Sequence, residues 1–356
     1  MASIQYPSLF ELNRRPTTRT VADAVRNVGL QGLPSAIRSG HGVVYQEVLC
    51  RSALNRVEGM PFGWTLNPYR GCTHGCHFCF ARKYQSQLGL GHGDQFSSVV
   101  IIKTNFAEVL TKELRRPRWN PQRDLIVLGT ATDPYQPIEG RYRLTRQALS
   151  ALIAHPTPLG IITRGPLAVR DVDLLAALSR LTRCTVTFSV PTVDEDAWHR
   201  LEPGTAHPLQ RLRAVRRLCR AGIDAGVLMA PIVPGISSHP AILDRTIRAI
   251  KDHGAAFVGA SLLHLDGTTR EHFFDFLSRT YPNLVERYGR LYAGKYPSAS
   301  YVERFHKVMT ILKANRDVRY RPDVDKHKRP GASPVQADHQ QLPLFRNQRT
   351  AVVRGL

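Results

Sequence analysis

The stretch NPYRGCTHGCHFCFAR, residues 67–82, decides the fold of this chain. It holds three of the chain's six cysteines, Cys72, Cys76 and Cys79, at the spacing Cys-x3-Cys-x2-Cys. A short loop of this kind can direct three thiolates toward one metal centre. The remaining three cysteines are scattered singly along the chain, so no second pair is present to complete a closed zinc site.

Two kinds of metal centre are compatible with this loop. Three thiolates suit a 4Fe–4S cluster whose fourth iron is left open to bind and activate a small molecule. Alternatively, His74 or His77 completes a Cys3His zinc site, although closed zinc sites rarely gather all their ligands within one short loop. The sequence therefore favours the cluster.

An aromatic residue, Phe78, stands directly before the third cysteine, and with it the loop resembles the signature of the radical S-adenosylmethionine (SAM) superfamily. Over about residues 50–300 the chain resembles the spore-photoproduct-lyase-like branch, often called DNA repair photolyases. The strings that carry this resemblance are LGTATDPYQPIE (128–139), LTRQAL (144–149), RGPLAVRDVDLL (164–175) and LEPGTAHPLQRLRAVRRLCRAGI (201–223). The resemblance implies a 4Fe–4S cluster, SAM, a 5′-deoxyadenosyl radical and an electron donor to the cluster.

The resemblance also implies roles for individual residues. Cys72, Cys76 and Cys79 match the cluster ligands. Polar residues that follow apolar segments match positions around SAM: its amino end, its carboxylate and its ribose. The segment MAPIVPG (229–235) matches the part of the family that packs near adenine. The implied cofactor-binding residues are Thr130, Thr132, Asp133, Arg164 and Ser189.

The chain departs from spore photoproduct lyase itself at three positions. That enzyme needs a cysteine hydrogen donor at the strand end that Thr130 occupies here, and it uses a pair of tyrosines beside the third cluster cysteine. Phe78 and Phe80 stand in those two places. Phenylalanine has no O–H to give, so we expect radical chemistry without a thiol–tyrosine relay.

Alternating strand-like and helix-like patterns predict an α/β fold with a parallel sheet, of the partial (β/α)6 barrel type that the resemblance implies. Six apolar segments are strand-like: 97–105, 124–130, 159–165, 184–190, 224–235 and 256–265. Catalytic groups of such barrels lie at the carboxyl ends of the strands. The expected division is an N-terminal extension (1–62), a radical SAM core (63–267), a helical C-terminal extension (268–320) and a disordered tail (321–356).

The formal net charge of +21 favours a polyanionic partner, and nucleic acid is the usual one. An arginine-rich proteome would give the same excess without a partner. No run of eighteen apolar residues is present and the first residues lack the pattern of a signal peptide, so we expect a cytoplasmic protein without a membrane span.

The string QQLPLF (340–345) interrupts the polar tail. It resembles the peptide with which polymerases and repair proteins bind the bacterial sliding clamp. The resemblance implies that Gln341, Leu342, Leu344 and Phe345 dock there, and the alternative is a tail that packs on its own barrel.

Together these features predict a radical SAM enzyme acting on or near DNA. A second hypothesis keeps the enzyme class and changes the substrate to RNA, a protein side chain or a small metabolite. A third is a zinc-dependent nucleic-acid-binding protein without catalysis.

Overall fold

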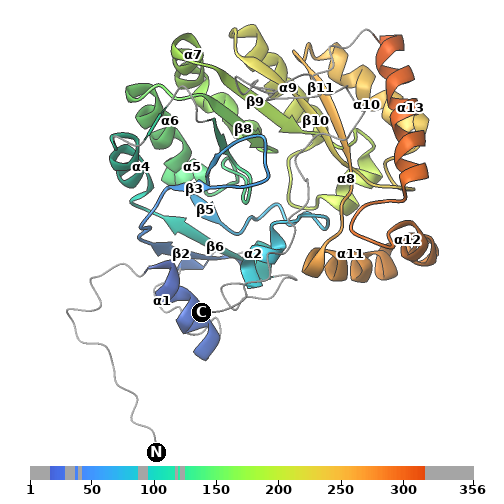
Figure 1. Ribbon diagram of the computed structural model, residues 1–356, viewed down its shortest axis with the longest axis horizontal. Coiled ribbons are helices and arrows are strands. Elements are labelled where there is room, and N and C mark those ends of the chain that lie inside the picture. The colour runs from blue at the N-terminus through green and yellow to red at the C-terminus, as the bar shows by residue number, and fades with distance from the viewer. Residues whose placement is uncertain are drawn as a thin grey trace, which may run out of the picture.

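The computed structural model describes residues 17–28, 37–38, 42–86, 95–116, 119–120 and 125–316 (Figure 1). The strands in this part of the chain are β1 (Ile37–Arg38), β2 (Val44–Val48), β3 (Leu54–Arg56), β4 (Trp64–Leu66), β5 (Tyr69–Arg70), β6 (Val99–Lys103), β7 (Ile126–Leu128), β8 (Leu159–Thr163), β9 (Cys184–Ser189), β10 (Asp224–Ile232) and β11 (Val258–Leu262). The helices are α1 (Thr18–Val28), α2 (Arg82–Ser86), α3 (Gln95–Ser98), α4 (Phe106–Leu114), α5 (Glu139–Tyr142), α6 (Leu144–Ala154), η2 (Pro166–Asp171), α7 (Val172–Leu181), α8 (Glu195–Leu201), α9 (Pro208–Arg220), α10 (Pro240–Asp252), α11 (Gly267–Thr280), η3 (Pro282–Leu284), α12 (Val285–Leu291) and α13 (Ala299–Arg316).

The main sheet has the strand order β11-β10-β9-β8-β7-β4-β3. Every neighbouring pair from β4 to β11 is parallel, and only β3 joins antiparallel, at the edge. Helices α4, α6, α7, α9 and α10 follow along the outside of this curved sheet (Figure 1). The expected α/β partial barrel of six parallel strands is therefore confirmed.

One expected barrel strand lies elsewhere. The apolar segment around Val99–Lys103, β6, pairs with β2 and β5 in a second sheet of order β1-β2-β6-β5. The composition of β6 could not show to which sheet it belongs. Its four apolar residues are fully buried in the second sheet, just as they would be in the barrel. The remaining barrel strand is β4, which at three residues is too short to give a periodic signal.

Residues 42–62 contribute strands to both sheets. β2 pairs with β6, and β3 pairs with β4. The sheets thus extend into the segment that the sequence assigned to an N-terminal extension, while the boundary at 62 itself stays a prediction.

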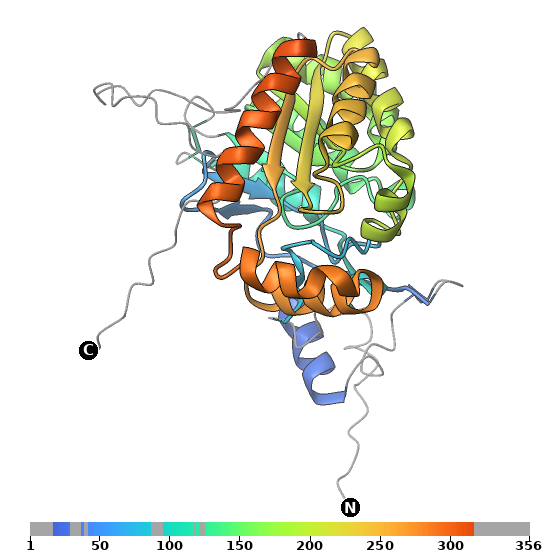
Figure 2. The same ribbon diagram turned by 90° about the vertical axis from the view of Figure 1, so that its right-hand side faces the viewer.

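The C-terminal helices divide into two groups (Figure 2). Helices α11 and α12 lie beyond the ends toward which β10 and β11 point, so they cover the carboxyl edge of that part of the sheet. Helix α13 packs beside α10, where Arg316 forms an ion pair of 2.6 Å with Asp244. The expected helical C-terminal region is therefore present over residues 267–316, while the bounds 268–320 stay a prediction and the expected disordered tail falls outside the described residues. Among the described residues, we find no helix with the length and apolar character needed to span a membrane.

Candidate functional site

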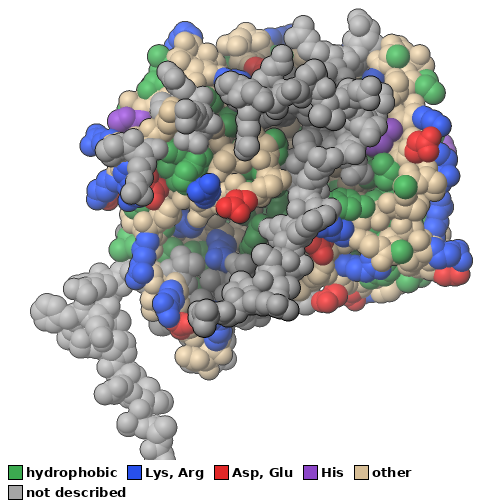
Figure 3. Space-filling view, viewed as in Figure 1, with side chains coloured by type: hydrophobic (Ala, Val, Ile, Leu, Met, Phe, Trp, Pro, Cys, Tyr) green, Lys and Arg blue, Asp and Glu red, His purple; other side chains and the backbone are tan. Residues whose placement is uncertain are grey.

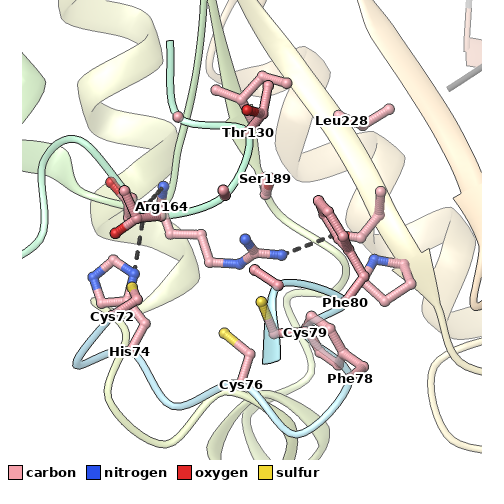
Figure 4. Close-up of a pocket in the computed structure, with 18 of the residues that line it drawn as sticks. Cys72, His74, Cys76, Phe78, Cys79, Phe80, Thr130, Arg164, Ser189 and Leu228 are labelled. Carbon is pink, nitrogen blue, oxygen red and sulfur yellow. Dashed lines mark hydrogen bonds and ion pairs between the residues drawn. The ribbon is translucent and has the colours of Figure 1, made fainter. Parts of the chain in front are cut away.

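The three cysteines lie in the loop between β5 and α2. Their spacing matches successive tight turns: the amide of Gly75 donates to the carbonyl of Cys72 (3.3 Å), and the amide of Cys79 donates to that of Cys76 (3.2 Å). All three thiols line one cavity that encloses about 1180 Å³ of empty space, its open mouth included. Figure 4 shows the sulfurs of Cys76 and Cys79 directed toward the guanidinium group of Arg164.

Burial sets the protonation of two of these thiols. It raises the pKa of Cys76 and Cys79, and the positive charge of Arg164 offsets only part of that rise. At neutral pH without a metal, both are therefore thiols. A metal takes the thiolate, so binding must release these protons.

The geometry does not favour a Cys3His zinc site. Over the part of the chain that the structure describes, no three Cys, His, Asp or Glu side chains converge so that they could hold one metal ion. The ring of His77 stacks on Phe276 at 4.2 Å and its Nδ1 lies 3.2 Å from Nε2 of His272, while Nδ1 of His74 lies 3.3 Å from Asp133. Both histidines are thus engaged beside the loop, whereas a four-iron cluster spreads its cysteine ligands farther apart than a single ion does.

Asp133 ties the sheet to the cysteine loop. Its carboxylate accepts hydrogen bonds from the hydroxyl of Thr163 and the amide of Arg164, both at 2.6 Å, and pairs with His74. Burial alone would raise the pKa of Asp133, but His74 and these donors lower it to about 2. Burial would likewise lower the pKa of His74, yet Cys72 and Asp133 raise it to about 10. The loop is thereby held against the carboxyl ends of β7 and β8.

The residues that the sequence assigned to SAM all line the same cavity. Thr132 uses its hydroxyl within the protein, donating to the carbonyl of Gly71 at 2.7 Å, and Thr130 accepts from Nδ2 of Asn67 at 3.3 Å. Ser189 ends β9 and lies with Thr130 across the cavity from the cysteines in Figure 4. The structure thus gathers Thr130, Thr132, Asp133, Arg164 and Ser189 at one place, and their contacts with SAM stay predictions.

A buried ion-pair cluster positions Arg164. Its Nε donates to Oε1 of Glu202 at 2.6 Å, while Arg211 donates from Nη1 to Oε2 of the same carboxylate at 2.9 Å. Burial alone would raise the pKa of Glu202, but the charges of Arg211 and Arg164 hold it below the usual range. Glu202 is thus a carboxylate at neutral pH, and it fixes a guanidinium group that lies 5.5 Å over the ring of Phe78.

The segment that carries Glu202 also packs directly on the cysteine loop. The carbonyl of Leu201 accepts from the amide of His77 (3.1 Å), and the amide of Gly204 donates to the carbonyl of His74 (3.0 Å). A Cβ atom on Gly204 would lie 2.3 Å from the carbonyl oxygen of Thr73, so only glycine fits there. In the sequence this segment stands out only through the family resemblance, so the roles of Glu202, Gly204 and Arg211 were missed.

Comparison with known proteins agrees with this geometry. The model of the Radical SAM superfamily matches residues 66–246. An uncharacterized protein of Mycobacterium tuberculosis is 40% identical over 292 residues, which cover 80% of this chain and 85% of that protein. A radical SAM Nα-GlyT isomerase of Pseudomonas phage M6 is 28% identical over 174 residues, covering 48% of this chain and 34% of that protein.

Among solved structures, spore photoproduct lyase complexed with dinucleoside spore photoproduct has a TM-score of 0.59 at 14% sequence identity, with 78% of this chain and 81% of that chain covered. A variant of the lyase with bound AdoMet and the same dinucleoside gives the same values. At this identity the likeness shows a common fold. The family model spans half of the chain, so this protein belongs to the radical SAM superfamily and is an enzyme of radical chemistry.

Proposed function

We propose that the protein holds a 4Fe–4S cluster on Cys72, Cys76 and Cys79, binds SAM beside it, and uses the resulting 5′-deoxyadenosyl radical on a nucleic-acid substrate, with DNA favoured. The observation that carries the proposal is that the three cysteines and Arg164 line one cavity at the carboxyl ends of parallel strands. An electron donor to the cluster belongs to the proposal.

The residues around the cysteines fit such a cluster. All three cysteines line the cavity, and the positive charge of Arg164 acts to lower the pKa of the Cys76 and Cys79 thiols, which favours the thiolates that a cluster requires. When bound, a reduced cluster supplies the electron that cleaves SAM to 5′-deoxyadenosyl radical and methionine.

The chain's own residues bind the cofactor and keep water out. Arg164, fixed by Glu202, presents a cation that suits the carboxylate of SAM. Apolar side chains make up much of the cavity wall, and such a lining excludes water and protects reactive intermediates. They include Phe62, Phe78, Phe96, Ile162 and Leu228.

Two observations support nucleic acid as the substrate class. The net charge is +21, and the fold is shared with an enzyme whose structure holds a dinucleoside lesion. In Figure 3 the Lys and Arg side chains are spread over the visible face rather than gathered in one patch, so charge alone does not mark a binding groove. The positions at which the lyase needs its thiol–tyrosine relay are occupied here by Thr130, Phe78 and Phe80. The proposed reaction is therefore not reversal of the spore lesion.

Release of 5′-deoxyadenosine tests the proposal. We expect the anaerobically reconstituted and reduced protein to form 5′-deoxyadenosine from SAM, and DNA to increase the rate, because a bound substrate consumes the radical. The nucleoside is measured by chromatography with and without DNA, RNA or a peptide mixture. No 5′-deoxyadenosine under any condition contradicts the proposal, while stimulation by RNA or peptide alone removes DNA from it.

The tail supplies a second proposed contact. The hypothesis that the tail docks on the bacterial sliding clamp stays a proposal, because its residues lie outside the described part of the chain. They are Gln341, Leu342, Leu344 and Phe345. Ordering a free peptide offsets part of the contact energy, so a peptide of residues 338–348 is expected to bind the clamp with a Kd on the order of micromolar. The same peptide with alanine at 344 and 345 is the control. Equal binding of both peptides, or of neither, contradicts the hypothesis.

A further inference from the structure

Aromatic and basic side chains lie in the wall of the cavity and beside it. They come from two places in the chain: Phe80, Lys83 and Tyr84 follow the cysteine loop, and His264, Lys295 and Tyr296 flank α11 and α12. Phe80 and His264 line the cavity itself and are only partly buried, while Lys83 is exposed. We call these six residues the rim.

The side chains of the rim contact one another in aromatic–aromatic and cation–aromatic pairs. The rings of His264 and Tyr296 lie 5.6 Å apart and are inclined by only 32°, with the ammonium group of Lys295 5.5 Å from the centre of the Tyr296 ring. On the other side, the ammonium group of Lys83 lies 5.4 Å from the centre of the Tyr84 ring. Each half of the rim thus combines an aromatic ring with a lysine ammonium group beside it.

Lysines from both halves of the rim act on the imidazole of His264. Burial lowers the pKa of His264; Asp266 acts in the opposite direction, and Lys83 and Lys295 add to the lowering. Both lysines therefore lie close enough to act on one imidazole at the cavity. A neutral imidazole at pH 7 leaves the positive charge of the rim to the two lysines, against the carboxylate of Asp266.

We propose that the rim binds one unpaired nucleotide of the substrate, with its base stacked against Tyr296 and His264 and its phosphate held by Lys83 and Lys295. This inference rests on the proposed function and names the form in which its substrate reaches the site. Aromatic faces interleaved with cations are how proteins hold single-stranded nucleic acid. The contact between Lys295 and Tyr296 is only partly buried, and such a cation–aromatic contact is weaker than base stacking, so a base can displace Lys295 from the ring while the ammonium moves to a phosphate.

The shape of the site favours an unpaired nucleotide over a duplex. The cysteines line the same cavity as Phe80 and His264, and Cys72 and Cys76 are buried. An atom within a base stack cannot reach such a pocket unless its nucleotide leaves the stack. An acidic peptide would satisfy the lysines but would leave the rings without a stacking partner. A nucleotide therefore suits both kinds of side chain in the rim: its base suits the aromatic rings, and its phosphate suits the lysines.

Fluorescence titration tests this proposal on the full-length, anaerobically reconstituted protein. The probe is a single-stranded oligonucleotide with one 2-aminopurine, whose emission changes on stacking. Tyr296→Ala is expected to weaken binding roughly 5- to 150-fold, the fold-change that corresponds to the loss of one base–aromatic stack. Tyr296→Phe keeps the ring and should bind like the wild type. Lys83→Ala with Lys295→Ala should make the dependence of log K on log salt less steep by about 0.7 for each phosphate that a lysine no longer neutralises.

Lys307→Ala is the matched control, because Lys307 is an exposed lysine on α13, paired with Glu303 and outside the rim. Iron content and circular dichroism of each variant exclude misfolding as the cause of weaker binding. If the wild type binds the oligonucleotide and the rim variants bind it as tightly as Lys307→Ala, the rim proposal is overturned while the proposed function stands. If the wild type binds no nucleic acid at low salt, the nucleic-acid substrate falls, and the rim proposal falls with it. The rim proposal is also overturned if a polyglutamate peptide displaces the 2-aminopurine probe as effectively as an unlabelled copy of the oligonucleotide does.

Discussion

Replacing Cys72, Cys76 or Cys79 with alanine is expected to abolish the iron content of the reconstituted protein. The wild type should hold about four irons and four sulfides per chain. With one thiolate removed, only two ligands remain in the loop, and neither His74 nor His77 can substitute, since both rings are engaged by other side chains. Iron and sulfide analysis after anaerobic reconstitution, together with the visible absorption spectrum, measures the effect.

Two other cysteines provide the controls. Cys184 begins β9 in the core, and Cys219 lies in α9 with its thiol donating to the carbonyl of Ala225 at 3.1 Å. Neither lines the cavity. Cys184→Ala and Cys219→Ala should therefore retain the full iron content, although both lose some packing. One zinc per chain and no iron after anaerobic expression would show that the loop is a zinc site.

The position of the three cysteines explains why the loop itself was predictable from the sequence. All of them lie within eight residues, so their proximity is fixed by local chain geometry and needs no knowledge of the fold. The parallel sheet was predictable for a similar reason, since a strand buried on both faces, such as IVL of β7, is a continuous apolar run. Local signals therefore gave the cysteine loop and most of the barrel.

What the sequence could not give depends on contacts between distant segments. β6 is as apolar as a barrel strand, yet it pairs with β2, more than fifty positions earlier in the chain. Glu202 meets Arg164 across 38 positions, and no local pattern distinguishes it from an ordinary helix-end carboxylate. Arg164 was assigned from resemblance alone, and only the structure shows what holds it in the cavity.

The ion-pair cluster behind Arg164 leads to the second large effect. Glu202→Gln is expected to destabilise the protein by about 3–5 kcal/mol, because it leaves the guanidinium groups of Arg211 and Arg164 facing a neutral amide in a buried site. The side chain of Arg211 is fully buried, so water cannot replace the missing charge. Urea unfolding of the metal-free protein measures this effect separately from cluster loss. Glu303→Gln is the matched control: its ion pair with Lys307 is exposed, and removing it should leave the free energy of unfolding nearly unchanged.

The dependence on pH distinguishes the missing charge from a simple change of packing. The pKa of Glu202 is depressed in the folded protein, so its ionised form adds stability above the unfolded pKa of about 4.3, and that stability is lost as the pH falls through the folded value. The difference in unfolding free energy between wild type and Glu202→Gln should thus be full at pH 7 and shrink progressively below about pH 4. A difference that stays constant down to the acid-unfolding range would mean that the amide disturbs packing and that the carboxylate is not what fixes Arg164.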